Sequence, residues 1–117
     1  MILFYPKYSP TCQMTTLIMI LKKEPYSVMV TGEKKYEYRD NSKYWTSRLF
    51  KKNGTPKDFK YIQFSNGYQK NRPQFTVEFK GVEIIDEVDE VYSNGFTVKY
   101  PQKKNGYYKI FLGDIIS

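Results

Sequence analysis

The residues best suited to chemistry lie in one short segment, Thr31 to Asp40. This segment contains the spacing Gly-x-Lys-x-x-Glu-x-Arg, formed by Gly32, Lys34, Glu37 and Arg39. A glycine permits the tight turn that follows a helix, and residues two apart on a strand share a face. The pattern therefore predicts that a lysine, a carboxylate and a guanidinium meet at the mouth of a small barrel. The simpler interpretation is an exposed charged strand whose glutamate and arginine pair weakly across solvent.

The composition excludes most familiar catalytic groups. The chain has 117 residues, no histidine and one cysteine, Cys12, which rules out catalytic triads, Cys–His dyads, disulfide frameworks and the common zinc sites. The acidic run ending at Glu90 lacks the spacing of a calcium loop, and we predict neither a metal nor a cofactor. Acid–base catalysis would depend on Glu37, Glu78, a tyrosine or a lysine, and Lys34 is the one candidate nucleophile or base.

The segment and its context resemble the ASCH domain family of the PUA-like superfamily, whose signature is GxKxxExR. Gly32, Lys34, Glu37 and Arg39 match that signature completely. The motif also follows a predicted strand and a short helix, as it does in the family, and the resemblance covers roughly residues 15–117. It implies a β-barrel with a cleft lined by the motif, and an association with RNA or modified nucleosides.

The same resemblance leaves an enzymatic alternative open, because some family members are reported as ribonucleases or as amidohydrolases acting on acylated cytidine. In the amidohydrolase type the motif lysine is catalytic and a threonine stands three residues later. Here those positions hold Lys34 and Glu37, and this departure argues against amide hydrolysis. If the protein is an enzyme, these two residues are the expected catalytic pair. A carboxylate beside the lysine favours stabilising a phosphodiester transition state over abstracting a proton.

Aromatic and basic side chains outside the motif extend the candidate binding surface. The sequence has 12 tyrosines, several of them next to lysines, and such pairs suit stacking on unpaired bases above a phosphate-binding surface. We expect most of these aromatics to belong to the core, whereas Tyr68 lies in a predicted turn, where functional residues concentrate. The predicted nucleic-acid-binding residues are Lys34, Lys35, Glu37, Arg39, Trp45, Arg48, Ser65, Asn66, Tyr68 and Arg72.

Strands must position most of these residues. Apolar runs and alternation predict a central first strand and a long strand with the clearest two-residue period, and Asn-Gly pairs predict turns. The expected strands are 16–22, 35–39, 59–65, 74–85 and 107–116, and the expected helices begin near 24 and run over 43–50, the second capped by Ser42. With about six strands and two short helices, we predict a mainly β (α+β) fold, a small, partly open PUA-like β-barrel.

The length indicates one domain, with an irregular leader over residues 1–14 and the folded domain over 15–117. No apolar run approaches the ~20 residues that cross a bilayer, and no secretory signal is readable. We therefore expect a cytoplasmic protein without membrane contact, as a monomer or weak dimer. The abundance of Lys, Tyr, Ile, Phe and Asn, with no alanine, is typical of AT-rich genomes such as those of many bacteriophages and low-GC bacteria.

The net charge of +7 is unevenly distributed. Residues 1–80 carry 15 basic and 6 acidic groups, whereas residues 81–90 carry five acids and no base. We predict that the acidic segment is a solvated loop that keeps nucleic acid off one side. A basic surface attracts nucleic acid, although a lysine-rich solubilising surface explains the charge equally well.

The function predicted from these observations is a nucleic-acid-binding module for single-stranded RNA or a modified nucleoside. The first alternative is a metal-independent ribonuclease or nucleoside amidohydrolase of the ASCH type. The second alternative is a protein-interaction module. If Lys34, Glu37 and Arg39 converge on one concave pocket, the structure favours the binding module or the enzyme. If they do not, the motif is a charged surface strand.

Overall fold

The computed structural model describes residues 16–116, so the predicted leader lies outside the described residues. Within them the protein is mainly β with two short helices, as the sequence predicts. The elements are β1 (Thr16–Leu21), α2 (Lys23–Val30), β2 (Tyr36–Asp40), α3 (Lys43–Leu49), β3 (Tyr61–Asn66), β4 (Gln74–Ile85), β5 (Val88–Val91), β6 (Thr97–Tyr100) and β7 (Tyr107–Ile115). Every strand and helix predicted above is present, with ends shifted by one or two residues.

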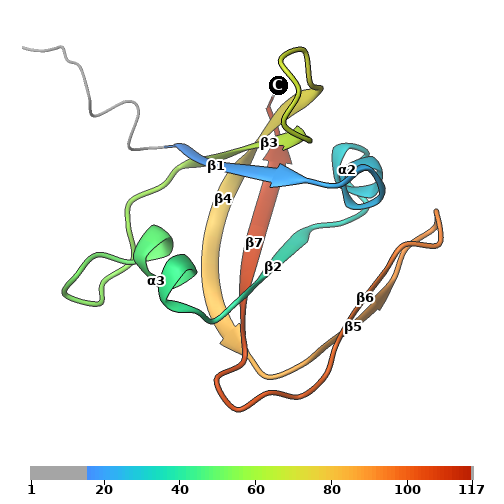
Figure 1. The fold of residues 1–117 in the computed structure, drawn as a ribbon. Coiled ribbons are helices and arrows are strands. Elements are labelled where there is room, and N and C mark those ends of the chain that lie inside the picture. The colour runs from blue at the N-terminus through green and yellow to red at the C-terminus, as the bar shows by residue number, and fades with distance from the viewer. Residues whose placement is uncertain (1–15, 117) are drawn as a thin grey trace, which may run out of the picture.

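Five strands form a curled half-barrel in the order β1-β3-β4-β7-β2, and β5 and β6 form a separate two-stranded sheet. β1 runs parallel to β3, and the other pairs are antiparallel. Figure 1 shows β4 and β7 as long strands through the molecule, with α3 on one flank and α2 and β5–β6 on the other. β4 shifts register against β7 between Val77 and Gly81, and Gly81 has a φ of 128°. Such irregularities bend a strand and help the sheet to curl.

Alternating apolar residues build the core inside this half-barrel. Ile62 and Phe64 of β3 are fully buried, and Phe75 and Val77 of β4 are nearly so, in keeping with the two-residue period of these strands. The main buried cluster consists of Leu17, Met19, Leu21, Met29, Leu49, Ile62, Phe64, Phe75, Val77, Tyr108 and Ile110. Each large apolar side chain buried in this way stabilises the fold by about 1.5–3 kcal/mol.

The prediction of a central first strand is wrong, because β1 lies at one edge of the sheet. Its inward residues are buried, but Ile18 on the other face is 51% exposed. The apolar run predicted a strand buried on both faces, but only one face of β1 packs against the core. Backbone carbonyls on its free edge accept hydrogen bonds from arginine side chains, as described below.

The acidic segment is also not the solvated loop that the sequence predicts. Residues 81–85 continue β4 and 88–91 form β5, which pairs with β6 across the Asn94-Gly95 turn. Glu90 accepts hydrogen bonds from the hydroxyls of Tyr38 and Tyr92. Its carboxylate therefore links the two-stranded sheet to β2 through Tyr38. The sequence pattern, a run of acidic residues, does not reveal this tertiary contact.

Candidate functional site

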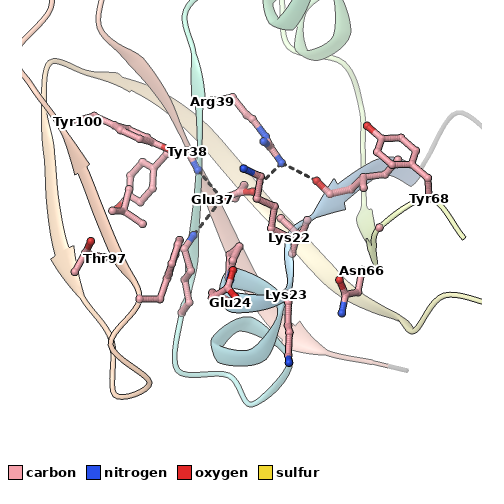
Figure 2. Close-up of a pocket in the computed structure, with 17 residues that line it drawn as sticks. Lys22, Lys23, Glu24, Glu37, Tyr38, Arg39, Asn66, Tyr68, Thr97 and Tyr100 are labelled. Atoms are coloured by element: carbon pink, nitrogen blue, oxygen red, sulfur yellow. Dashed lines mark hydrogen bonds and ion pairs between the residues drawn. The ribbon is translucent and has the colours of Figure 1, made fainter.

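A cleft of about 730 Å³ opens between the half-barrel and the β5–β6 sheet. It is bounded by the end of β1, the start of α2, the motif residues of β2, the β3–β4 turn and β6, and Figure 2 shows these side chains facing a common space. Its volume falls within the usual range for small-molecule sites. The lining residues are Ile20, Leu21, Lys22, Lys23, Glu24, Pro25, Lys34, Glu37, Tyr38, Arg39, Asn66, Gly67, Tyr68, Phe96, Thr97, Val98 and Tyr100.

Lys34 is positioned by the turn that ends α2. Gly32 has a φ of 87°, in the region that glycine tolerates best, and the Lys34 amide donates to the carbonyl of Val28 at 2.9 Å. The Lys34 side chain turns inward and is only 1% exposed. Its Nζ donates to Glu37 Oε1 at 3.1 Å and to the carbonyl oxygen of Tyr36. Lys34 is among the largest fully buried side chains and therefore contributes to packing as well as to charge.

Glu37 links the three motif side chains. The residue is 6% exposed, and its Oε1 accepts from both Lys34 Nζ and the Tyr38 amide, the latter at 3.0 Å. Its Oε2 lies 2.8 Å from Arg39 Nη2. One buried carboxylate thus holds two cations and a backbone donor, which is the satisfaction that a buried charge requires. The predicted convergence of the three side chains on one cleft is confirmed.

Arg39 and two residues of α3 close the gap between β2 and β1. Both Arg39 and Arg48 lie over the Trp45 ring, with Cζ atoms 5.1 and 4.9 Å from its centre. Arg48 Nη2 donates to the carbonyl of Ile18 at 2.8 Å, and Arg39 Nη2 reaches the carbonyl of Ile20 at 3.5 Å. The guanidinium groups therefore satisfy carbonyls on the free edge of β1. Trp45 and Arg48 lie behind Arg39 and do not line the cleft.

The β5–β6 sheet supplies an aromatic wall that sequence reasoning missed. Phe96, Tyr100 and, from β2, Tyr38 line this side of the cleft. Tyr38 is 4% exposed, and its burial, with the carboxylate of Glu90, raises its pKa. Burial also raises the pKa of Tyr100, with the nearby charge of Glu37 adding to the shift. These tyrosines are accordingly neutral hydrogen-bonding groups at physiological pH.

Two further contacts dock the turn of this sheet against α2. Glu33 accepts from the backbone amide of Ser93 at 2.8 Å and from its hydroxyl at 2.6 Å, and these hydrogen bonds lower the pKa of Glu33. Asn94 Nδ2 donates to the carbonyl of Glu24 at 3.2 Å. The wall of the cleft is thus tied to the segment that carries the motif.

The opposite wall and the rim are polar and more exposed. Tyr68 in the β3–β4 turn is 83% exposed, and Figure 2 shows it across the cleft from Tyr100, with Lys22, Glu37 and Arg39 between them. Counting lysines, arginines and glutamates, the lining has four cations and two anions. The cleft therefore combines aromatic surfaces, hydrogen-bonding groups and a net positive charge.

The remaining predicted residues fall in several places. Asn66 and Tyr68 line the cleft, whereas Lys35 is exposed on its far side, beside Tyr36 and Glu33. Ser65 is 2% exposed, and its hydroxyl has no hydrogen-bond partner among residues 16–116. Arg72 donates to the carbonyl of Gln69 within its own turn. None of Lys35, Ser65 and Arg72 lines the cleft.

Sequence reasoning missed Lys22 and Lys23 at the rim, as well as the aromatic wall. The two lysines were visible where the predicted strand 16–22 gives way to the helix predicted to begin near 24, and such connections often carry functional residues. The wall could have been inferred from the Asn94-Gly95 turn signal, which lies between alternating residues on each side. Its docking on the motif is a long-range contact that no local pattern encodes.

Within residues 16–116, no three histidine, cysteine, aspartate or glutamate side chains lie close enough to share a metal ion. No helix in this part of the chain is long and apolar enough to cross a membrane. Comparisons with protein-family models, with curated proteins and with solved structures gave no significant match. The chemistry of the cleft therefore carries the functional argument.

Proposed function

We propose that the protein is an ASCH-type, PUA-like module that binds single-stranded RNA or a modified nucleoside in this cleft. The observation that carries the proposal is the linked set of Lys34, Glu37 and Arg39 in a concave site with aromatic side chains on two sides. This arrangement is more than a charged surface strand, because the carboxylate and the lysine are both buried.

The site offers the groups that recognise an unpaired base. Single-stranded RNA is read by stacking bases on aromatic rings and by hydrogen bonds to their exposed edges. Tyr68 and Tyr100 supply rings, and Arg39, whose side chain is 24% exposed, supplies donors. Because Glu37 holds this guanidinium, it would meet a base edge in a fixed orientation.

The rim offers contacts for phosphate groups. Lys22 and Lys23 are exposed at the entrance to the cleft, where α2 begins without a side-chain cap. The amides of an uncapped first helical turn attract anions, and lysines add positive charge that is indifferent to base sequence. The proposed interaction is therefore weakly sequence-selective and weakens as the salt concentration rises.

Titration of fluorescently labelled single-stranded RNA at low and moderate salt tests the proposal. We compare the wild type with Tyr68→Ala, which removes an exposed ring from the cleft, and with Tyr44→Ala, which removes an exposed ring elsewhere. Loss of one stacking contact costs about 1–3 kcal/mol of binding free energy, so the expected Kd of Tyr68→Ala is at least fivefold higher. Absence of binding at low salt, or equal effects of the two substitutions, would contradict the proposal.

A further inference from the structure

A second cavity lies on α3 and on the loop that follows it. It has a volume of about 590 Å³ and is formed by residues 41–43, 46–47, 50–52 and 57, and we call it the lysine groove. Four lysines line it, Lys43, Lys51, Lys52 and Lys57, and no carboxylate does. The cleft described above mixes both signs of charge, so the two cavities differ in the ligand chemistry they favour.

The ammonium groups of the groove are largely unpaired within residues 16–116. Lys51 has one ion pair, with Asp58 at 3.7 Å, and the Asp58 side chain is 94% exposed. An exposed pair of this kind contributes little and is easily exchanged. No ion pair or hydrogen bond to the side chains of Lys43, Lys52 and Lys57 occurs among the described residues. Four lysines around a hollow therefore concentrate positive charge that the fold does not neutralise.

The polar side chains of the groove are fixed by the fold. Ser42 Oγ accepts from the Trp45 amide at the start of α3, and Thr46 Oγ1 lies 2.6 Å from the hydroxyl of Tyr108. Asn41 Nδ2 donates to the carbonyl of Asn105 at 2.7 Å. The floor is thus held in place, and the lysines are the groups left to meet a ligand.

We infer that the lysine groove binds the phosphodiester backbone of the same RNA strand whose base enters the cleft. Lysine is a point charge suited to phosphate without planar recognition, and the groove contains no arginine. This inference rests on the proposed function for the identity of the ligand. It adds a second contact site, at which phosphates are bound without reading of the bases.

The path of β2 connects the two sites. Arg39 lines the cleft and Asn41 lines the groove, and two residues of extended chain span only about 7 Å. Figure 1 shows β2 running from the side of α2 to α3. One RNA strand of several nucleotides that follows β2 would therefore reach both cavities, whereas a dinucleotide held in the cleft would not reach the groove.

The test compares two double substitutions that remove the same charge. Lys43→Gln with Lys52→Gln removes two exposed groove lysines, and Lys60→Gln with Lys104→Gln removes two exposed lysines that line neither cavity. Binding is measured by fluorescence anisotropy with a long single-stranded RNA and with a dinucleotide, each over a range of salt concentrations. Far-ultraviolet circular dichroism checks that all proteins are folded.

For the long RNA we expect the groove variant to bind roughly five- to tenfold more weakly than the control variant. The negative slope of log K against log salt should also be shallower by about 1.4 in the groove variant. Each lost phosphate contact on a single strand accounts for about 0.7 of that slope. Dinucleotide binding should be the same for both variants. Equal affinities and slopes of the two variants for the long RNA would overturn the groove while leaving the cleft intact. Absence of RNA binding by the wild type would overturn both proposals.

Discussion

Lys34 is held inside the barrel by two acceptors, a carboxylate and a backbone carbonyl. The motif predicted which residues would meet, because Glu37 and Arg39 are two apart on a strand. It could not predict the burial of the lysine, because that depends on the inward direction of the chain after Gly32. A charged residue after a turn is usually exposed, and here the nearby carboxylate makes burial tolerable.

Replacing Lys34 by alanine should destabilise the protein. The substitution leaves Glu37 with one side-chain partner fewer and opens a void in a packed region, and breaking a buried pair in this way costs about 3 kcal/mol. Urea unfolding followed by circular dichroism measures the effect. The double variant Lys34→Met with Glu37→Gln, which removes both charges, should recover part of the loss. A Lys34→Ala protein with a wild-type unfolding midpoint would show that the lysine is exposed in solution.

The same contacts predict binding without turnover. The Lys34 side chain is only 1% exposed, and its Nζ donates to Glu37 and to a backbone carbonyl, so this amine is not presented to a substrate in the cleft. We expect single-stranded RNA and N4-acetylcytidine to remain intact when incubated with the protein in the presence of chelator. Release of cytidine would establish an amidohydrolase. RNA cleavage that survives chelation and disappears in a folded Glu37→Gln variant would establish a ribonuclease.

At the scale of elements, arginines from β2 and α3 complete the edge of β1. The sequence placed Arg48 among the nucleic-acid-binding residues, but its guanidinium donates to Ile18 and lies over Trp45. We expect Arg48→Ala to lower the free energy of unfolding by about 1 kcal/mol, from the lost hydrogen bond and cation–π contact. Hydrogen exchange should also quicken in β1. Arg72→Ala, which removes an arginine from the β3–β4 turn, is the matched control. Equal exchange rates of the β1 amides in the two variants would show that Arg48 does not stabilise this strand.

The β5–β6 sheet should detach more readily at alkaline pH. Burial and the carboxylate of Glu90 raise the pKa of Tyr38 and Tyr92 above the ordinary value of 10.0. A group whose pKa is raised by folding contributes its full stability below the unfolded pKa and loses that contribution as the pH rises further. The free energy of unfolding should therefore fall above about pH 10.

Urea unfolding at neutral pH and near pH 11 measures this fall for three proteins. In Tyr92→Phe the fall should be smaller than in the wild type, because one of the two hydroxyls that donate to Glu90 is absent. Tyr44→Phe, at an exposed tyrosine, should retain the wild-type pH dependence. Identical pH dependence in Tyr92→Phe and the wild type would contradict the role of the buried tyrosines.

Local signals were sufficient for most elements and insufficient for their placement. Periodicity located all five strands of the half-barrel, and Ser42 and Gly32 marked helix ends where the structure has them. The edge position of β1 and the docking of β5–β6 depend on contacts between residues far apart in the chain. For the same reason the motif half of the cleft was predicted, whereas its second wall was not.

At the scale of the whole molecule, the charges are arranged around two cavities on different flanks. The cleft lies by α2 and β6, and the lysine groove lies by α3. Most of the acidic segment 81–90 belongs to β4 and β5, and the carboxylate of Glu90 accepts hydrogen bonds from two tyrosines within the fold. The excess of positive charge in the net +7 therefore lies mainly around the two cavities. This distribution favours one extended polyanionic ligand over a general solubilising surface.

Backbone-amide NMR of the protein titrated with a single-stranded RNA trinucleotide tests the central claim most directly, because it reports the location of binding residue by residue. We predict saturable shifts at the segments that line the cleft, residues 20–25, 34–39, 66–68 and 96–100, and small changes at the end of β4, residues 82–85. A protein whose amides do not shift at low salt, or whose shifts avoid the cleft segments, would contradict the account.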